Sequence, residues 1–469
     1  MVKAKTYKSI LKVASSNLIY LLSSILVGFL LPKIIGVTNY GYYKTFTLYA
    51  TYIGLFQIGI VDGIYLKYGG KTYDELDKST FNFYSKFLFC LELLFSAILL
   101  VIAILFLESD IRFIFVCMSI YLLFYNISNY YKFISQITSR FNEYSIRTII
   151  KSILTTILII SLFLVYYFTS NILSYKVYLV CFISIEGLLM LWYLHTYREL
   201  SFRKANTNIN KKKEIISLVK IGVPLLVANL CSTLLLTVDR QFVNIFFELE
   251  EYSIYAFAYN MLSLITIVAT AISTVLYPTI KSSNGDSGEN YKSLTTAILL
   301  FAFCCLVAYF PLCIFVDYFL PSYTYSLIIF RIILPGVAMS TVITSVIHNY
   351  FKKIEKNLFF LGICILMLIL SIGFNFLAYY FFGTMEAISW ASVIVTFIWY
   401  FMGELYLKKK FMIRTLSNNL YMIVMTLTFY IVTLISNIFI SLIIYVILLL
   451  IISFVFNCKT ILKFLKKGG

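Results

Sequence analysis

The chain has 469 residues, of which 61% are hydrophobic and 13% are charged, and its mean hydropathy is +0.91. An ordinary soluble domain is about 45–50% apolar and about 25% charged, so this composition excludes a water-soluble protein and indicates one embedded in lipid. Fourteen spans of roughly 20 residues would use roughly 280 residues, which excludes a large soluble domain as well. In a membrane protein, a net charge of +17 is first explained by basic residues that mark the cytoplasmic side of the membrane. We therefore expect no nucleic-acid partner.

Fourteen apolar segments are long enough to cross a membrane as helices. They are unbroken apolar runs rather than alternations of about ten residues, which favours helices over a β-barrel. In chain order they are residues 13–35, 44–66, 84–107, 113–134, 146–168, 172–194, 218–247, 252–280, 294–316, 325–347, 358–382, 384–407, 416–436 and 438–456. The sequence thus predicts an all-α polytopic membrane protein with about 14 transmembrane helices.

The basic residues alternate with the predicted helices. Of the 38 Lys and Arg residues, 32 lie at the two termini or after even-numbered helices, and cytoplasmic segments carry such an excess, so both termini should be cytoplasmic. The four on the opposite face are Lys33, Lys44, Arg112 and Lys176. Lys33 and Lys44 flank the first outer turn, either as interface anchors or as a cationic rim for an anionic substrate.

The longest loop, at about residues 197–217, divides the predicted helices into six, six and two. A weak repeat supports this division, because the first and seventh helices begin near Lys12 and Lys220 and each leads to a Tyr-x-x-Tyr turn. Odd-numbered helices run in the same direction in both halves, so the repeats would be parallel. We expect an N-terminal lobe at 1–196, a basic cytoplasmic linker at 197–217, a C-terminal lobe at 218–410, and two helices with a basic tail at 411–469.

Acidic residues inside the predicted spans are candidates for ion coupling, because a charge buried in hydrocarbon is costly and usually faces a cavity. Four of them are the candidates: Asp62, Glu92, Glu186 and Asp239. The alternatives are snorkelling or a pairing with Lys67 for Asp62, and a buried structural pair for Glu92 and Glu186.

Two arginines, Arg240 and Arg331, also lie well away from the ends of predicted spans. Asp239 and Arg240 are adjacent and point about 100° apart on a helix, so at least one of them should face an aqueous cleft. Arg331 precedes the helix-breaking pair Pro335-Gly336. An intramembrane guanidinium beside a break suits a gate or a phosphate contact, with snorkelling to the outer interface as the alternative.

No constellation for chemistry is apparent in the sequence. The nine cysteines lie in or at the edge of apolar runs, without the spacing of a metal site, and no phosphate-binding loop of the Walker type is present. The predicted outer loops are short and carry few acid or base groups. We therefore expect no catalytic residues, no metal and no cofactor, and a transporter rather than an enzyme.

Two stretches carry a resemblance to a known family. One is Leu-Pro-Lys-Ile-Ile-Gly-Val-Thr-Asn-Tyr-Gly-Tyr-Tyr at residues 31–43; the other runs from Gly-Val-Pro at 222–224 through Val-Asp-Arg at 238–240 to Tyr-Ser-Ile-Tyr at 252–255. With the arrangement of six, six and two helices, they resemble the polysaccharide-exporter branch of the multidrug/oligosaccharidyl-lipid/polysaccharide (MOP) transporter superfamily, the Wzx-type flippases. The sequence departs from the family at residues 251–253, where a glycine is usual.

The resemblance implies two six-helix lobes with pseudo-twofold symmetry, as in the MATE exporters of the same superfamily, around a cleft that alternates between two openings. It implies a flippase that moves undecaprenyl-diphosphate-linked oligosaccharide repeat units, of the O-antigen or capsule type, from the inner to the outer leaflet of the bacterial cytoplasmic membrane. Arg240 and Arg331 would hold the diphosphate, and Asp239, Glu186 and Glu92 would couple transport to an ion gradient. The polymerase and chain-length regulator of the same pathway would be partners.

Two other functions stay open. The first is a cation-coupled multidrug exporter of the same superfamily, although Arg240 favours an anionic substrate over the cationic drugs that acidic cavities prefer. The second is an enzyme, a membrane polysaccharide polymerase, which the short outer loops oppose.

Overall fold

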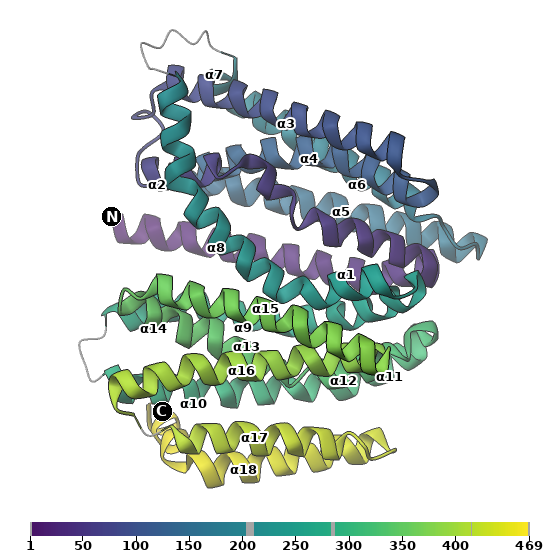
Figure 1. The fold of residues 1–469 in the computed structure, drawn as a ribbon, viewed down its shortest axis with the longest axis vertical. Helices are drawn as coiled ribbons and strands as arrows, with labels where there is room; N and C mark the ends of the chain where they lie inside the picture. The colour runs from purple at the N-terminus through teal and green to yellow at the C-terminus, as the bar shows by residue number, and fades with distance from the viewer. Residues whose placement is uncertain (1, 203–210, 283–286, 414, 468–469) are drawn as a thin grey trace. The chain divides into compact units, whose positions relative to one another are not determined.

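The computed structural model describes residues 2–202, 211–282, 287–413 and 415–467, and within these ranges the regular structure is helical (Figure 1). In chain order the elements are α1 (Val2–Ala50), η1 (Ile53–Gln57), α2 (Ile60–Tyr68), α3 (Lys78–Phe106), α4 (Ser109–Ile137), α5 (Phe141–Thr169), α6 (Tyr175–Thr196), α7 (Arg198–Ser201), α8 (Lys211–Phe246), α9 (Leu249–Ser282), α10 (Ser287–Cys305), η2 (Leu306–Ala308), α11 (Tyr309–Phe319), η3 (Pro321–Tyr323), α12 (Ser326–Ile333), α13 (Gly336–Val342), η4 (Ile343–Ile347), α14 (His348–Lys353), α15 (Asn357–Phe382), α16 (Met385–Phe411), α17 (Leu416–Val432) and α18 (Ile438–Lys467).

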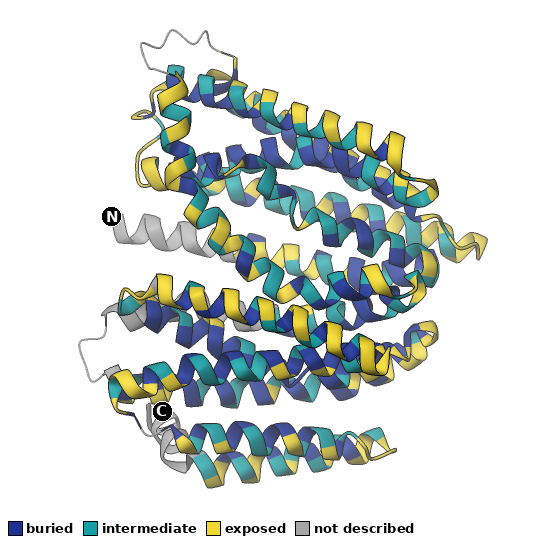
Figure 2. Cartoon of the chain, in the orientation of Figure 1, coloured by how far each residue is buried: buried dark blue, intermediate teal, exposed yellow. Residues whose placement is uncertain are grey.

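The predicted spans coincide with these helices in chain order. Among the described residues, ten helices are long and apolar enough to cross a membrane, or eleven if the bent pair Ser326–Ile333 and Gly336–Lys353 is one span, and Leu416–Val432 is a shorter apolar helix. Large apolar side chains stay exposed along helices such as α3 and α15, where Phe106 is 76% exposed and Phe376 is 55% exposed (Figure 2). Such surfaces fit lipid as the solvent, which confirms the all-α polytopic membrane protein.

Helix α1 consists of two helices joined at Gly36, whose backbone angles are φ 74° and ψ 175°. The left-handed φ favours glycine, and there is room for a Cβ, which would lie 3.6 Å from Ile172. An unbroken helix of this length would extend about 73 Å, more than twice the hydrocarbon thickness of a bilayer. The chain instead turns back at Gly36 (Figure 1), at the position of the predicted first turn.

The second predicted span is broken. Between the end of α1 and the start of α2 the chain forms only the short 3₁₀ turn η1, followed by positive φ angles at Ile58 (49°) and Gly59 (72°). Helix α2 then crosses α8 so closely that a Cβ on Gly222 would lie 1.8 Å from the Gly59 carbonyl oxygen. The break therefore brings α2 against the first half of α8 at a crossing that only glycine permits.

The tenth predicted span is also interrupted, where the sequence predicted it. Helices α12 and α13 meet at Leu334 and Pro335 with a bend of 42° between the two parts of the span. Proline has no N–H to donate and its ring clashes with the preceding turn, so the helix changes direction there. The predicted helix break at Pro335-Gly336 is confirmed, and it leaves Arg331 on the segment before the bend.

The chain forms two compact units, residues 1–233 and 234–469, and the boundary lies within α8. The predicted linker at 197–217 lies partly outside the described residues, which resume at Lys211. The predicted lobes 1–196 and 218–410, and the separate pair of helices at 411–469, stay a prediction.

The core of the first unit is rich in buried tyrosines. Tyr84, Tyr130 and Tyr131 are at most 1% exposed, and the Tyr131 hydroxyl lies 2.6 Å from both the Ser85 and the Ser201 hydroxyls. Because buried polar atoms are costly without partners, these contacts hold α7 against α3 and α4. Of these three helices, α4 also lines the cavity described below.

Asp77 caps the first turn of α3. Its carboxylate accepts the backbone N–H groups of Ser79 and Thr80 at 3.2 Å each and the hydroxyl of Thr80, and the hydrogen bonds from Thr80 lower the pKa of Asp77. We expect Asp77→Ala to lower the free energy of unfolding by about 1 kcal/mol at pH 7. Because the folded pKa lies below the unfolded value of about 3.9, the contribution is complete above that pH and lost as the pH falls further.

Thermal unfolding of the wild type and of Asp77→Ala in detergent tests whether the Asp77 carboxylate stabilises this helix end. The midpoints should differ at pH 7 and draw together as the pH falls below the unfolded pKa of about 3.9, until Asp77 is protonated in the folded as well as the unfolded state. A difference that stays the same down to pH 3 would show that the carboxylate charge does not act at this helix end.

Candidate functional site

A cavity of about 290 Å³ lies in the first unit among α1, α4, α5 and α6. Its lining is almost entirely polar or aromatic and consists of Asn17, Tyr20, Tyr125, Ser128, Asn129, Lys132, Tyr144, Arg147, Thr148, Lys151, Glu186, Leu189 and Tyr193. Three cations and one carboxylate thus share a small space between helices whose other faces are apolar.

The lining residues recur at helical spacing. On α5, Arg147 and Lys151 are one turn apart and therefore lie on the same face. On α4, Tyr125, Asn129 and Lys132 follow at intervals of four and three residues. Each helix thus presents a polar stripe to the cavity, which is the pattern of a buried hydrophilic site in a bundle.

Lys151 and Glu186 form an ion pair across the cavity, from α5 to α6. The Glu186 side chain is 3% exposed and that of Lys151 is 25% exposed, so the carboxylate is buried and the ammonium partly accessible. A buried ion pair is held mainly by mutual neutralisation, because either charge alone would be strongly unfavourable there. Glu186 therefore lies in the buried structural pair that the sequence left open, and its partner is on the cavity wall.

The other two cations differ in how they are held. Arg147 donates to the Glu143 carboxylate and to the Thr196 hydroxyl at 2.5 Å each, and its guanidinium lies 4.3 Å from the Tyr193 ring centre. Lys132 lies 5.5 Å from the Tyr144 ring centre and makes no hydrogen bond or ion pair with the residues that the structure describes. Lys132 is thus the cation most open to a ligand.

The balance of charge makes this a site for anions. Three cations and one carboxylate line the cavity, a net charge of +2, and counting Glu143 at the edge leaves +1. Ammonium and guanidinium groups bind phosphate oxygens through charge-assisted hydrogen bonds, and aromatic rings such as Tyr20 and Tyr125 offer flat faces to a sugar. The cavity can therefore hold an anionic group next to a polar, ring-containing one.

The sequence did not predict this site. Lys132, Arg147 and Lys151 are among the 32 basic residues assigned to the cytoplasmic side, and the structure places them on α4 and α5 at a shared cavity. The signal that could have found them is the spacing of Arg147 and Lys151, which puts two cations on one face of a helix beside Thr148.

In the second unit, Asp239 lies beside a cavity of about 90 Å³ among α8, α9, α13 and α16. The residue is 4% exposed, and one carboxylate oxygen accepts the hydroxyls of Tyr255 (3.0 Å), Tyr259 and Ser392 (3.2 Å). The neighbouring Arg240 instead donates to the Leu236 carbonyl at 2.6 Å, and its guanidinium lies 4.8 Å from the Tyr259 ring centre. The two adjacent charges therefore share Tyr259, which contacts Asp239 through its hydroxyl and Arg240 through its ring.

The remaining acidic candidates, Glu92 and Asp62, line neither of these two cavities. Glu92 on α3 is 1% exposed and accepts the Asn126 amide at 2.7 Å, and its other carboxylate oxygen has no hydrogen-bond partner among the described atoms. Asp62 on α2 lines a cavity of about 170 Å³ with residues of α8. Lys67, its predicted alternative partner, pairs with Glu214 at 2.5 Å instead.

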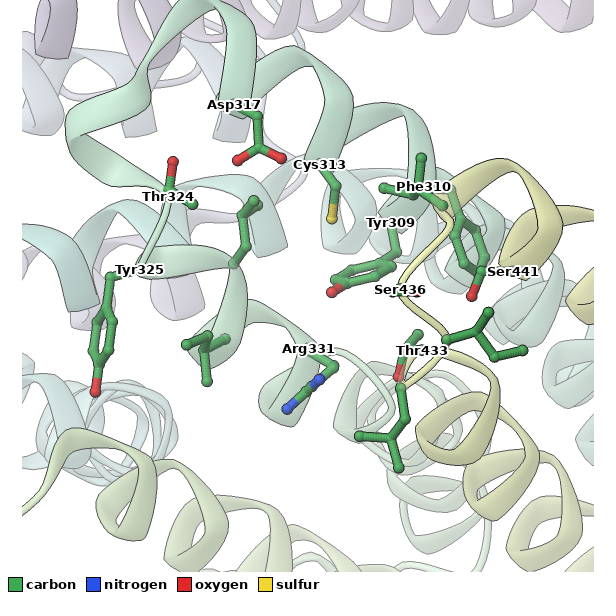
Figure 3. A pocket seen from close by; sticks show the side chains of 15 residues that line it. Tyr309, Phe310, Cys313, Asp317, Thr324, Tyr325, Arg331, Thr433, Ser436 and Ser441 are labelled. Atoms are coloured by element: carbon green, nitrogen blue, oxygen red, sulfur yellow. The ribbon is translucent and has the colours of Figure 1, made fainter.

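The predicted basic residues are divided between the two units. Lys44 lies 5.1 Å from the Tyr40 ring centre and Lys33 precedes the Gly36 turn, both on α1 of the first unit. Arg240 and Arg331 belong to the second unit, and Arg331 lines a pocket of its own (Figure 3). The structure thus adds Lys132, Arg147 and Lys151 to the predicted set as a cluster on one cavity.

Comparisons with known proteins extend these observations. The sequence profile of the family described as polysaccharide biosynthesis protein matches residues 7–284. A comparison with curated proteins gave no match. Among solved structures, the chain is similar to the lipid II flippase MurJ in an inward closed conformation, at 15% identity, over 97% of this chain and 100% of that one, with a TM-score of 0.72.

The chain is also similar to an inward-facing multidrug resistance MATE transporter of the MOP superfamily, at 14% identity, over 84% of this chain and 94% of that one, with a TM-score of 0.63. At such low identities the likeness shows the fold, which is the one that the motifs at residues 31–43 and 222–255 implied. The family match covers more than half of the chain. The protein therefore belongs to the polysaccharide biosynthesis protein family, on the MOP-superfamily transporter fold that its sequence resembled.

Proposed function

We propose that this protein is a flippase that moves undecaprenyl-diphosphate-linked oligosaccharide repeat units, of the O-antigen or capsule type, from the inner to the outer leaflet by alternating access. The observation that carries the proposal is the cavity of the first unit, in which Lys132, Arg147 and Lys151 face a single carboxylate. A diphosphate and a sugar cannot cross hydrocarbon unaided, whereas their lipid tail can stay in the bilayer. A protein that shields the head group needs only a few cations, bound loosely enough to release the product.

The predicted coupling to an ion gradient would use the buried carboxylates. Asp239, with three hydroxyl partners, offers oxygen atoms that suit a proton or a hard cation. Glu92 and Asp62 lie at two other buried or partly buried positions of the first unit. Glu186 has a different part in this proposal, because it competes with the diphosphate for Lys151 and so helps to release the substrate.

The sidedness of the chain follows from its charges. We place both termini in the cytoplasm of a bacterium and the chain in its cytoplasmic membrane, since 32 of the 38 basic residues lie on that predicted side. Lys33, Lys44, Arg240 and Arg331 are further proposed contacts for the anionic substrate. The polymerase and chain-length regulator of the pathway would take the product on the outer side.

Depletion of the protein in cells tests the proposal against both alternatives. A flippase should leave labelled lipid-linked repeat units on the cytoplasmic leaflet, and restored protein should clear them. Units that reach the outer leaflet normally but stay unpolymerised would favour a polymerase. Loss of resistance to cationic drugs with normal repeat-unit export would favour the drug exporter.

Lys132→Gln gives a sharper test of the cavity. Because Lys132 has no ion-pair partner among the described residues, the change should leave the fold intact and weaken binding of the lipid diphosphate about 10- to 100-fold. Lys71→Gln is the matched control, since Lys71 also lies over a tyrosine ring, 5.2 Å from the centre of Tyr68, but outside the cavity. Equal affinity in Lys132→Gln and wild type would remove the cavity from the substrate path.

A further inference from the structure

A second polar pocket, of about 430 Å³, lies in the second unit between the α11–α12 segment and the turn that joins α17 to α18 (Figure 3). Hydroxyl groups of Thr324, Tyr325, Thr433 and Ser436 line it, together with the guanidinium of Arg331. None of these residues belongs to the cavity of the first unit, which is formed by α1, α4, α5 and α6. The pocket therefore needs an explanation of its own.

Among the described residues that line the pocket, Arg331 is the one cation. It is half-buried on α12 and makes no hydrogen bond or ion pair with the described residues, although it carries five N–H donors and is always charged. The carboxylate of Asp317 also lines the pocket, but it is exposed and forms no ion pair with Arg331. Figure 3 shows Asp317 on the far side of the pocket from Arg331.

The surroundings of Arg331 combine hydrogen-bonding and apolar groups. The Ser436 hydroxyl makes no hydrogen bond with a described residue and is free to donate to a ligand. Leu434, Ile435 and Ile328 also line the pocket, and they are 71%, 37% and 37% exposed. A ligand that fits here has several acceptor oxygens at one end and an apolar chain at the other.

We propose that this pocket binds the phosphate group of a lipid. Arg331 donates to two phosphate oxygens through its planar fork, Ser436 donates to another, and the lipid chain lies along Leu434 and Ile435. We place this pocket in the outer leaflet, and this placement rests on the proposed function, because it uses the predicted cytoplasmic termini. The phosphate belongs either to a bilayer phospholipid or to a polyprenyl phosphate, which share this chemistry.

Native mass spectrometry of the full-length protein in detergent tests the site. Phosphatidylglycerol and undecaprenyl phosphate are titrated separately, with diacylglycerol as a lipid that lacks phosphate and inorganic phosphate as an anion that lacks a tail. We expect at least one phospholipid or polyprenyl phosphate to bind, and Arg331→Gln to reduce its bound fraction at least tenfold. Arg112→Gln, which changes an exposed arginine of the first unit, should leave binding unchanged.

The outcomes distinguish a bilayer phospholipid from a polyprenyl phosphate, and they test this lipid site separately from the proposed flippase function. Preference for phosphatidylglycerol assigns the pocket to the bilayer, and preference for undecaprenyl phosphate assigns it to the substrate or product. Binding that Arg331→Gln leaves unchanged, or that diacylglycerol or inorganic phosphate matches, would overturn the site. Arg331→Lys and Ser436→Ala, which should weaken binding less, serve if the first variant does not fold, and Lys132→Gln should bind phosphatidylglycerol, a lipid not assigned to the first cavity, as wild type does.

Discussion

Replacing Lys151 by methionine should lower the free energy of unfolding by about 3–5 kcal/mol, because it leaves the Glu186 carboxylate buried without its cation. The methionine side chain fills a similar volume, so the loss comes from the uncompensated charge rather than from a cavity. Denaturant unfolding in detergent, followed by tryptophan fluorescence, measures this loss.

The double variant Lys151→Met with Glu186→Leu separates stability from transport. Removing both charges should bring stability back to within about 1 kcal/mol of wild type, because replacing a whole buried pair by apolar groups is often neutral. Both the single and the double variant should fail to transport the substrate, since the cavity then lacks one of its three cations. If Lys151→Met is as stable as wild type, the ion pair between Lys151 and Glu186 does not form in the folded protein. If the double variant still transports the substrate, Lys151 does not belong to the substrate site.

Among glycine-to-alanine substitutions in the first unit, Gly222→Ala should lower the stability of the protein most. The added Cβ would lie 1.8 Å from the Gly59 carbonyl oxygen and 2.5 Å from the Gly63 nitrogen, so backbone would meet backbone where α2 crosses α8. Overpacking usually costs about 1–3 kcal/mol, and we expect the upper end or more because no side chain can move aside. The measurement is the midpoint of thermal unfolding and the yield of folded protein in detergent.

Gly373→Ala on α15 is the matched control. No atom lies within 4 Å of the added Cβ, and alanine is favoured over glycine inside a helix by up to about 1 kcal/mol. This variant should be as stable as wild type or slightly more stable. If Gly222→Ala behaves like Gly373→Ala, then α2 and α8 do not approach each other as closely as described.

Much of the fold could be predicted because the bilayer imposes it. Apolar length and the alternation of basic residues located the helices, and Pro335 located the bend between α12 and α13. The break near Ile58 was missed, because the apolar run continues through it and isoleucine is not a residue type that marks a positive φ. The close approach of Gly59 and Gly222 likewise depends on residues far apart in the chain.

The candidate site was harder to predict because it depends on helix register. Lys132 and Lys151 lie near the ends of predicted spans, where a basic residue ordinarily marks the cytoplasmic side. Only the packing of α5 against α6 brings Lys151 to Glu186, 35 residues further along the chain. Glu186 was identified from its intramembrane position, whereas its partner was hidden among the charges that indicate topology.

The most direct test of the account is translocation by the purified full chain in vesicles. A fluorescent undecaprenyl-diphosphate oligosaccharide is placed in one leaflet, and its arrival in the other is followed with a quencher that does not cross the membrane. Wild type and Lys71→Gln should move it at equal rates, Lys132→Gln at least tenfold more slowly, and an oligosaccharide on undecaprenol without the diphosphate should hardly move. Wild-type vesicles that match protein-free vesicles, or that move both lipids equally, would contradict the proposed flippase.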